Sequence, residues 1–258
     1  MLDQITPLLL TYNEAPNIGR TLDQLRWARR VVVVDSYSDD ATLTILAGYR
    51  NVSVFQRRFD THAQQWNFGL LETGIETPWI MALDADYFIT EAGADELRAL
   101  APPPDVAGYS ANFLYCVNGR VLRGSAYPPV TVLYRRAAGR YQQDGHTQRI
   151  ELHGRVLALG TPIMHDDRKP LRHWVSAQER YMRLEAAKLR NASWRSIGWA
   201  DRLRRLRVVA PFVMLAYCLF IRGGILDGRA GIYYAFQRTF AELMLSLSLL
   251  EGDLFGRG

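Results

Sequence analysis

The chain has 258 residues, of which 48% are apolar and 22% are charged, so it can bury a sizeable core and is neither a disordered tail nor a collagen-like fibre. Residues 1–167 carry 15 Lys and Arg against 19 Asp and Glu, whereas residues 168–258 carry 16 against 7. This uneven charge argues against a protein that wraps nucleic acid, and it favours an anionic membrane surface as partner of the basic second part.

Apolar strand-like runs alternate with helical patterns along the first third of the chain. This alternation implies an α/β fold with a mostly parallel sheet and right-handed crossovers. The expected strands are residues 5–12, 31–34, 52–55 and 79–83, and the expected helices are residues 17–29, 38–46 and 63–73.

The pattern changes in the second half. Residues 108–163 are rich in aromatic residues and predict short strands of a different subregion packed on the first. The chain then becomes helical and rich in Arg, with apolar stretches at 208–221 and 232–250. We therefore predict an α/β domain over residues 1–168 and a helical region over residues 169–258.

The two cysteines and the first residues give a prediction of compartment. Two cysteines cannot form a disulfide framework, so Cys116 and Cys218 are expected to be free thiols in a reducing compartment. The N-terminus lacks a basic segment followed by a long apolar stretch, which predicts no secretory signal. We expect a cytoplasmic protein.

Acidic residues follow three of the predicted strands. Glu14 comes after the first strand, Asp35 after the second, and Asp84 and Asp86 after the strand at 79–83. Ligands of such sheets bind at the carboxyl ends of the strands, so these side chains are expected in one crevice. A carboxylate pair two residues apart can hold Mn²⁺ or Mg²⁺, which neutralises a diphosphate leaving group.

Three segments carry a family resemblance: Thr11 to Glu14 (TYNE), Val34 to Thr42 (VDSYSDDAT) and Leu83 to Asp86 (LDAD). In order and spacing they resemble the successive signatures of family 2 glycosyltransferases with the GT-A fold. The resemblance covers roughly residues 5 to 165.

A closer likeness is to the bacterial lipopolysaccharide-core glucosyltransferase branch. It rests on Arg58 to Asp60, on Gln65 and Asn67, and on Gly224 to Gly231. The implied reaction is inverting transfer of a hexose from a nucleotide sugar, a UDP-sugar above all, to a lipid-linked glycan or lipopolysaccharide-core acceptor.

The resemblance also implies which residues bind the donor. Asp35 would read the base. Arg168 and Lys169 are expected to pair with the diphosphate because cations at this position balance the leaving-group charge, and a surface charge run is the alternative. For Asp39 and Asp40, helix capping is the alternative, and we expect one of the two to do only that. The implied donor-binding residues are Thr11, Tyr12, Glu14, Asp35, Asp39, Gln65, Asn67, Asp84 and Arg168.

Metal ligands are expected at three positions. Asp84 and Asp86 would be joined by His165, because a late His often completes metal coordination in GT-A enzymes and an imidazole with two carboxylates suits Mn²⁺ or Mg²⁺.

The general base is expected beyond residue 140. Thr147 stands where the closer branch tends to show an acidic residue, which leaves Asp144 with His146 as the predicted base. A structural, hydrogen-bonding role is the alternative for His146. Asp166 and Asp167 are the rival candidates, and we include Asp167 among the catalytic residues.

A membrane contact is predicted around the first apolar stretch. Arg202, Arg204, Arg205 and Arg207 lead into residues 208–221, which are too few to span a bilayer. An interfacial element is the expectation, and a buried core helix is the alternative. Residues 232–250 contain Gln237, Arg238 and Glu242, which makes a lipid-spanning role costly.

The sequence therefore predicts a metal-dependent glycosyltransferase, peripheral on the inner face of the plasma membrane, with no nucleic-acid partner. A polyprenyl-phosphate glycosyltransferase would share the donor site and differ in its acceptor. A nucleotide-binding scaffold of the same fold without turnover is the third reading, since Thr147 replaces the expected acid.

Overall fold

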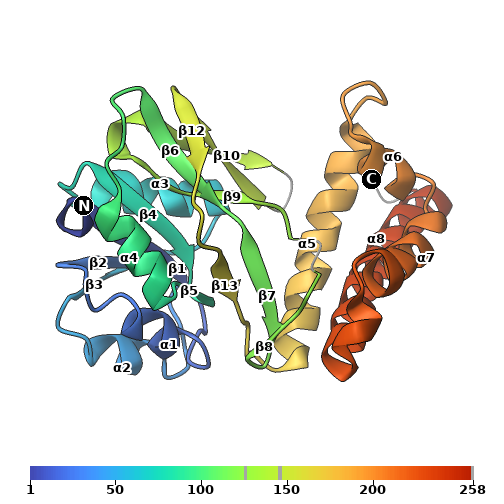
Figure 1. Ribbon diagram of the computed structural model, residues 1–258. Helices are drawn as coiled ribbons and strands as arrows, with labels where there is room; N and C mark the ends of the chain where they lie inside the picture. The colour runs from blue at the N-terminus through green and yellow to red at the C-terminus, as the bar shows by residue number, and fades with distance from the viewer. Residues whose placement is uncertain (125–126, 145–146, 257–258) are drawn as a thin grey trace. The chain divides into compact units, whose positions relative to one another are not determined.

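The computed structural model describes residues 1–124, 127–144 and 147–256 (Figure 1). The chain divides into two compact units. The N-terminal unit comprises residues 1–119, 127–143 and 147–169, and the C-terminal unit is built mainly from Pro170 onward, together with residues 120–124.

The N-terminal unit contains most of the strands. They are β1 (Ile5–Thr11), β2 (Val31–Asp35), β3 (Val52–Gln56), β4 (Trp79–Asp84), β5 (Tyr87–Phe88), β6 (Val106–Ala111), β7 (Phe113–Val117), β9 (Val130–Arg135), β10 (Gly139–Asp144), β11 (Thr147–Leu152), β12 (Arg155–Ala158) and β13 (Ile163–His165). Its helices are α1 (Ile18–Asp23), α2 (Thr42–Ala47), α3 (His62–Glu72) and α4 (Glu91–Ala99).

These elements confirm the predicted alternation of strands and helices, with two differences. The predicted helix at 17–29 was too long, because α1 ends at Asp23 and the chain goes on in tight turns, with the N–H of Leu25 donating to the carbonyl of Leu22 at 2.9 Å. Helix α4 was not predicted from the sequence.

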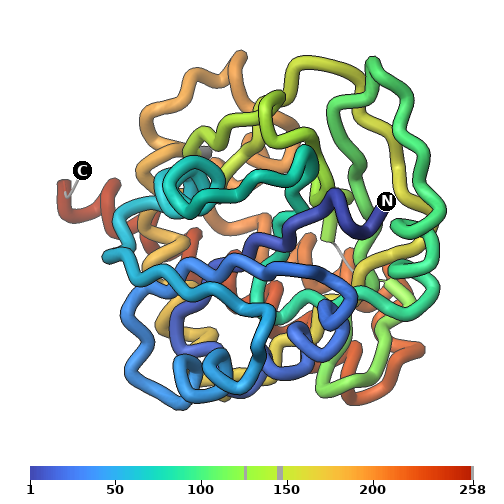
Figure 2. The backbone as a smooth tube through the Cα atoms, turned by 90° about the vertical axis from the view of Figure 1, so that its left-hand side faces the viewer, coloured from blue at the N-terminus to red at the C-terminus, as the bar shows by residue number. Residues whose placement is uncertain are grey.

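The main sheet has the strand order β12-β6-β9-β4-β1-β2-β3, with these strands labelled in Figure 1. Figure 2 traces the backbone from the N-terminus in blue to the C-terminus in red. Strands β4, β1, β2 and β3 run parallel to one another, as do β12 and β6. Strand β9 is antiparallel to both of its neighbours. The prediction of an α/β fold with a mostly parallel sheet is therefore confirmed, and the arrangement is consistent with GT-A.

Both faces of this sheet are covered. Leu9, Val31 and Val33 point into one core cluster, and Leu8 and Val32 point into the other, as the alternation of side chains along a strand requires. Parallel strands buried on both faces read as continuous apolar runs, which is why β1 and β2 stood out in the sequence.

Helix α3 lies very close to one face of the sheet. A Cβ built on Gly69 would meet Leu8 Cδ1 at 2.7 Å and Val34 Cγ2 at 3.2 Å. Glycine at this position thus allows the helix to pack against β1 and β2. The same helix carries Gln65 and Asn67.

The C-terminal unit is helical. Its small core consists of Met182, Ala186, Leu189, Leu245 and Leu249. Helix α8 packs against both α5 and α7. The elements of this unit are β8 (Arg120–Val121), α5 (Leu171–Asn191), α6 (Trp199–Arg204), α7 (Val209–Ala216), a π-helical segment (Tyr217–Ile221) and α8 (Arg229–Phe255).

The apolar stretch 208–221 forms α7 and the π-helical segment rather than a core helix. Ala210, Pro211 and Cys218 are buried, whereas Phe212 and Phe220 are each 67% exposed. The buried-helix alternative therefore does not hold for this stretch. Within the described residues, every helix is too short or too polar to cross a bilayer.

Three of the four arginines before this stretch have partners within the unit. Arg204 donates from Nε and Nη2 to the buried Glu242 carboxylate, at 3.1 and 2.7 Å. Arg205 Nε donates to the Leu189 carbonyl at 2.9 Å, and Arg207 pairs with Asp253. Only Arg202 of the four is classed as exposed.

Candidate active site

The predicted acidic residues lie at one edge of the main sheet. Thr11 at the end of β1 is in register with Asp35 at the end of β2, and Leu10 is in register with Asp84 at the end of β4. The carboxyl ends of three neighbouring strands therefore stop at the same level, as expected for a ligand-binding edge.

Asp35 is fully buried, and its carboxylate accepts hydrogen bonds from neighbouring protein groups. Thr11 Oγ1 donates to it at 2.9 Å, and Ser38 donates from its backbone N at 2.9 Å and from Oγ at 2.5 Å. Gln56 Nε2 lies 3.5 Å away. Asp35 and Thr11 thus fix the loop that follows β2, and contacts of Asp35 with the donor base and of Thr11 with the nucleoside diphosphate stay predictions.

The next residues of the two loops hold each other. Asn13 Nδ2 donates to Asp39 Oδ1 at 2.7 Å, and the backbone N of Asp39 donates to Asn13 Oδ1 at 3.0 Å. Asp40 accepts from the backbone N of Thr42 at the start of α2, at 2.9 Å, and from the backbone N of Ala15, at 3.1 Å, while the N-cap position of α2 is Ala41. Asp40 thus satisfies a backbone donor of the first helical residue. Tyr12 is 49% exposed beside them.

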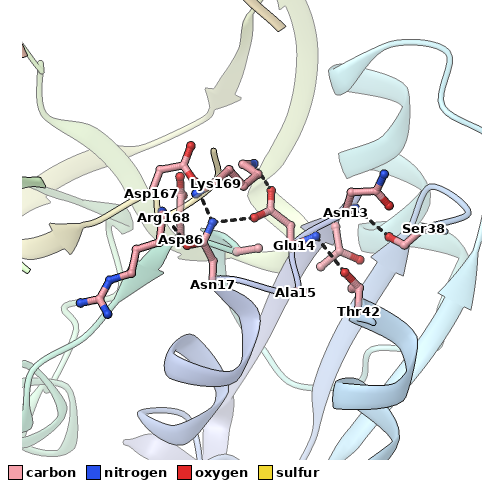
Figure 3. A network of polar contacts seen from close by, with 12 residues as sticks. Asn13, Glu14, Ala15, Asn17, Ser38, Thr42, Asp86, Asp167, Arg168 and Lys169 are labelled. Carbon is pink, nitrogen blue, oxygen red and sulfur yellow. Dashed lines mark hydrogen bonds and ion pairs between the residues drawn. The ribbon is translucent and has the colours of Figure 1, made fainter. Parts of the chain in front are cut away.

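Glu14 forms an ion pair with Lys169 across a long sequence separation (Figure 3). Lys169 Nζ lies 2.5 Å from Glu14 Oε1, and Asn17 Nδ2 donates to Glu14 Oε2 at 2.9 Å. Burial raises the pKa of Glu14 to about 7, although Lys169 acts in the opposite direction. Burial acts to lower the pKa of Lys169, but the Glu14 carboxylate outweighs it and holds that pKa above its ordinary value.

Asp84 and Asp86 form an unequal pair. Burial first, and then the charge of Asp86, raises the pKa of Asp84 to about 6. Burial also acts to raise the pKa of Asp86, but the His165 imidazole more than offsets it, so that the Asp86 pKa lies below its usual range. Asp86 is therefore the ionised member of the pair, and Asp84 holds a proton more readily.

His165 lies against Asp86 inside a ring of tyrosines. Its Nε2 is 3.1 Å from Asp86 Oδ2, and its ring centroid lies 5.0 Å from Tyr87, 4.6 Å from Tyr115 and 5.0 Å from Tyr127. Burial acts to lower the pKa of His165, but Asp86 raises it above its ordinary value. The other nitrogen, Nδ1, is buried and has no hydrogen-bond partner among the described residues.

The segment after β13 is fastened by Asp166, which is 1% exposed. Arg20 Nη1 and Arg168 Nε each donate to Asp166 Oδ2 at 2.9 Å, and the backbone N of Gly119 donates to Oδ1 at 3.0 Å. Such a buried carboxylate with several charge-assisted hydrogen bonds orients its neighbours rather than reacting.

Asp167 and Arg168 are both tied to the buried Asn17. Asn17 Nδ2 donates to Asp167 Oδ1 at 2.8 Å, and the backbone N of Arg168 donates to Asn17 Oδ1 at 2.9 Å (Figure 3). The backbone N of Lys169 also donates to Asp167 Oδ1, at 2.9 Å. Asp167 is thus a structural anchor of this segment, while the Arg168 side chain is 39% exposed and able to meet a ligand.

The two predicted residues of α3 have structural hydrogen bonds. Gln65 is fully buried and donates from Nε2 to Ser36 Oγ at 3.0 Å and to the Arg57 carbonyl at 3.2 Å. Asn67 exchanges two hydrogen bonds with the backbone of Tyr141, at 2.9 and 3.0 Å. We assign both residues a positioning role.

The predicted general base is not placed by the structure. His146 lies outside the described residues, and Asp144 ends β10 in a stretch where only the backbone is described. The assignment of Asp144 with His146 stays a prediction.

Residues 8–157 match the family described as Glycosyl transferase family 2. The chain belongs to this family. Its solved structural neighbours include S. aureus TarS 1–349 in complex with UDP-GlcNAc, at 14% identity and a TM-score of 0.47, over 96% of this chain and 91% of that one. GalNAc-T7 with UDP, GalNAc and Mn²⁺ aligns at 11% identity and a TM-score of 0.47, over 80% and 51% of the two chains.

The described residues of this family 2 glycosyltransferase supply part of the ligand set that a divalent cation needs. No three His, Cys, Asp or Glu side chains in the described part of the chain are grouped so that they could hold a metal ion. Asp86 and His165 nevertheless offer a carboxylate and an imidazole at 3.1 Å, a donor pair that suits Mn²⁺. Mg²⁺ likewise is commonly bound by one or two protein carboxylates plus substrate phosphates.

Sequence reasoning missed Asn17 and Arg20, which organise this glycosyltransferase site from α1 and the residue before it. Both look like ordinary residues at the start of a helix. Only their partners, some 150 positions later in the chain, give them a role, so no local signal marks them.

Proposed function

We propose that the chain is a metal-dependent inverting glycosyltransferase that moves a hexose from a nucleotide sugar, a UDP-sugar above all, to a lipid-linked glycan or lipopolysaccharide-core acceptor at the cytosolic face of a membrane. The observation that carries the donor part is the group formed by Glu14, Asp86, His165 and Lys169 at the strand ends of a family 2 domain. Opposite charges meet there at a sheet edge that suits a charged ligand.

The cations of this group suit a diphosphate. An ammonium has three donors, and Glu14 takes one of those of Lys169, so Lys169 keeps others for phosphate oxygens while Glu14 holds it in place. Arg168, fixed by Asp166 and Asn17, brings a second positive charge with an exposed side chain. Positive charge fixed beforehand stabilises a leaving diphosphate as it departs.

Asp86 and His165 are the residues that would hold a divalent cation, with Asp84 behind them. When bound, the cation supplies further charge neutralisation for the diphosphate. The tyrosines packed around His165 hold its ring in one position.

The general base is proposed to be Asp144, with His146 as its neighbour. Asp167 is the weaker candidate, because Asn17 and the backbone of Lys169 already use its Oδ1. Single-turnover transfer under saturating donor separates them: Asp144→Asn is expected to lose the chemical step with unchanged donor affinity. Normal transfer in that variant and a large loss in Asp167→Asn would move the base to Asp167.

A thermal-shift panel tests the donor proposal. UDP-, GDP-, dTDP- and CMP-sugars are compared with and without Mn²⁺, because a ligand that binds the native state raises the unfolding temperature. We expect the largest rise with a UDP-sugar plus Mn²⁺. Stabilisation with no transfer to any lipid or polyprenyl-phosphate acceptor would favour the inactive scaffold, and transfer to a polyprenyl phosphate would favour that alternative activity.

The membrane part of the proposal rests on the surface of the C-terminal unit. Phe212, Phe220, Ile221 and Leu226 are 67 to 75% exposed, and Arg222 is exposed between them in the chain. The region from residue 168 onward carries 16 basic against 7 acidic residues. Exposed apolar side chains with arginines are typical of helices that lie in the interface of an anionic membrane.

Sedimentation with lipid vesicles tests this contact. The full chain is expected to bind vesicles that contain anionic lipid at low salt, less at high salt, and less after Phe220→Ser. Val54→Ser, at an exposed apolar residue of the N-terminal unit, is the matched control. Equal binding of the control and Phe220→Ser, or no binding at low salt, would contradict the membrane surface.

A further inference from the structure

A hollow of about 540 Å³ opens at the sheet edge, and its lining is Ser36, Tyr37, Arg58 and Phe59. The first two residues follow β2 directly, and the other two follow β3 after one residue. Strands β2 and β3 are parallel neighbours, with Asp35 in register with Gln56. The hollow thus lies beyond the carboxyl ends of two adjacent strands, where ligands of such sheets bind.

Tyr37 has an unusual backbone for a large residue. Its φ is 61°, in the left-handed region that favours glycine, and its side chain is 53% exposed. Such a conformation costs about 1–3 kcal/mol. Half of the ring remains in water, so burial in the core offsets only part of this cost. Strain at an exposed aromatic residue on a ligand-binding edge points to a use other than folding.

The residues on both sides of Tyr37 hold it in this conformation. Ser38 donates from its backbone N and from Oγ to the buried Asp35 carboxylate. On the other side, Ser36 Oγ accepts from Gln65 Nε2 at 3.0 Å. Both neighbours are thus anchored to buried side chains, so the backbone of Tyr37 is held in this conformation.

The second wall of the hollow is fixed by the same glutamine. Gln65 donates to the Arg57 carbonyl at 3.2 Å and accepts from Arg57 Nη1 at 2.6 Å, and Arg57 pairs with Asp60 at 2.7 Å. Phe59, between these two charged residues in the chain, is 49% exposed and meets His62 edge-on with ring centroids 4.9 Å apart. A single buried amide therefore ties the two loops together.

We propose that Tyr37 and Phe59 form an aromatic clamp for the base of the nucleotide donor, with Arg58 as the cationic side of the clamp. The inference rests on the proposed function and adds to it the residues that bind the base. Two half-exposed rings around one hollow suit a flat heterocycle, and stacking on aromatic side chains accepts any base because each base has a π face. The clamp therefore supplies affinity, and selection among bases falls to other groups.

Calorimetric titration of the full-length protein with UDP and with inorganic pyrophosphate, each with Mn²⁺, tests the clamp. Tyr37→Gly and Phe59→Ala are each expected to raise the Kd for UDP by about 5- to 100-fold, in line with the measured worth of base stacking. The Kd for pyrophosphate, which has no base, is expected to stay within about twofold. Tyr37→Phe keeps the ring and should bind UDP like the unmodified protein.

Stability separates stacking from damage to the fold. Glycine adopts the left-handed conformation freely, so Tyr37→Gly is expected to melt no earlier than the unmodified protein while it binds UDP more weakly. Leu71→Ala, at a residue of α3 that is also 49% exposed, is the matched control and should change neither affinity.

Two results would overturn the clamp. One is unchanged UDP affinity in both Tyr37→Gly and Phe59→Ala, and the other is an equal loss of UDP and pyrophosphate affinity in them. Failure of the unmodified protein to bind UDP would instead refute the proposed UDP donor, and failure to bind any nucleoside diphosphate would refute the clamp with it.

Discussion

The two units of the chain place their apolar residues in opposite ways. The largest fully buried side chains, such as Trp79, Tyr134 and Leu9, belong to the N-terminal unit, whereas the C-terminal unit has a core cluster of five residues and leaves Phe212 and Phe220 mostly exposed. Apolar content alone therefore does not separate a core from a surface. In the N-terminal unit, buried apolar residues support the polar side chains at the edge of the sheet. In the C-terminal unit, apolar residues such as Phe212 and Phe220 form part of the exposed surface.

Asp166→Ala is expected to have the largest effect on stability. It leaves the guanidinium of Arg20, whose side chain is 29% exposed, without its carboxylate partner, and loss of one member of a buried ion pair costs about 3–5 kcal/mol. Urea denaturation measures the change. Asp105→Ala, which breaks an exposed pair with Arg155, is the control and should cost less than about 1 kcal/mol. An equal loss of unfolding free energy in Asp166→Ala and Asp105→Ala would show that the hydrogen bonds of Asp166 do not hold the site region rigidly.

A pair of truncations tests the contrast between the units directly. Leu9→Ala removes a side chain that is 0% exposed and should destabilise by about 2–5 kcal/mol. Phe212→Ala removes a larger side chain that is 67% exposed, and its cost is expected within about 0.5 kcal/mol. Both are measured by chemical denaturation of the full chain. A loss at Phe212 as large as that at Leu9 would mean that the exposed face is part of a core.

Asp86→Asn should keep the fold and lower transfer by about 100- to 1000-fold, because it weakens the proposed site of the cation that would neutralise the diphosphate, and loss of such charge stabilisation has effects of that size. Initial rates with a UDP-sugar measure the loss, and thermal unfolding checks the fold. Asp105→Asn controls for the change of charge. A variant with more than about a third of the normal rate would show that Asp86 is not needed for the leaving group.

The smallest expected effect is a difference in the reaction rate of two thiols, one in each unit. Cys116 and Cys218 are free and buried, and burial raises the pKa of Cys116 to about 11, so at pH 8 about one part in a thousand of it is thiolate. Both should react slowly with a thiol reagent, and about tenfold faster for each pH unit up to the pKa. Cys218 should react before Cys116, because its unit has the smaller core and opens more easily. Cys116→Ser and Cys218→Ser separate the two rates, and faster reaction of Cys116 would reverse the ranking of the units.

The sequence correctly predicted those elements whose structure depends on their own residues. Strand β2 contains a run of four valines buried on both faces, and Asp84 ends β4 with Asp86 two residues later, so both the sheet and its acidic edge were visible. The contact between His165 and Asp86 also joins two predicted ligands.

The remaining features depend on partners that a linear pattern does not show. The hydrogen bonds of the Gln65 and Asn67 amides to a serine side chain and to a backbone group were not predicted from the sequence, and a contact of either residue with the donor stays a prediction. The length of residues 208–221 allowed both a core helix and an interfacial element, since only packing decides which side chains are covered. The left-handed Tyr37 is a further case, because a tyrosine gives no sign of positive φ.

The hydrogen bond between Asn17 and Asp167 has a consequence for synthesis of the chain. The two residues are 150 positions apart, and Lys169, the partner of Glu14, comes later still. On the ribosome the first strand and helix are made long before the residues that complete the site. Glu14 therefore has no counter-ion until Lys169 has been added, at nearly two thirds of these 258 residues. Contacts of such long sequence separation form late and slow the folding reaction. Shorter nascent chains would therefore have a sheet without a finished donor site.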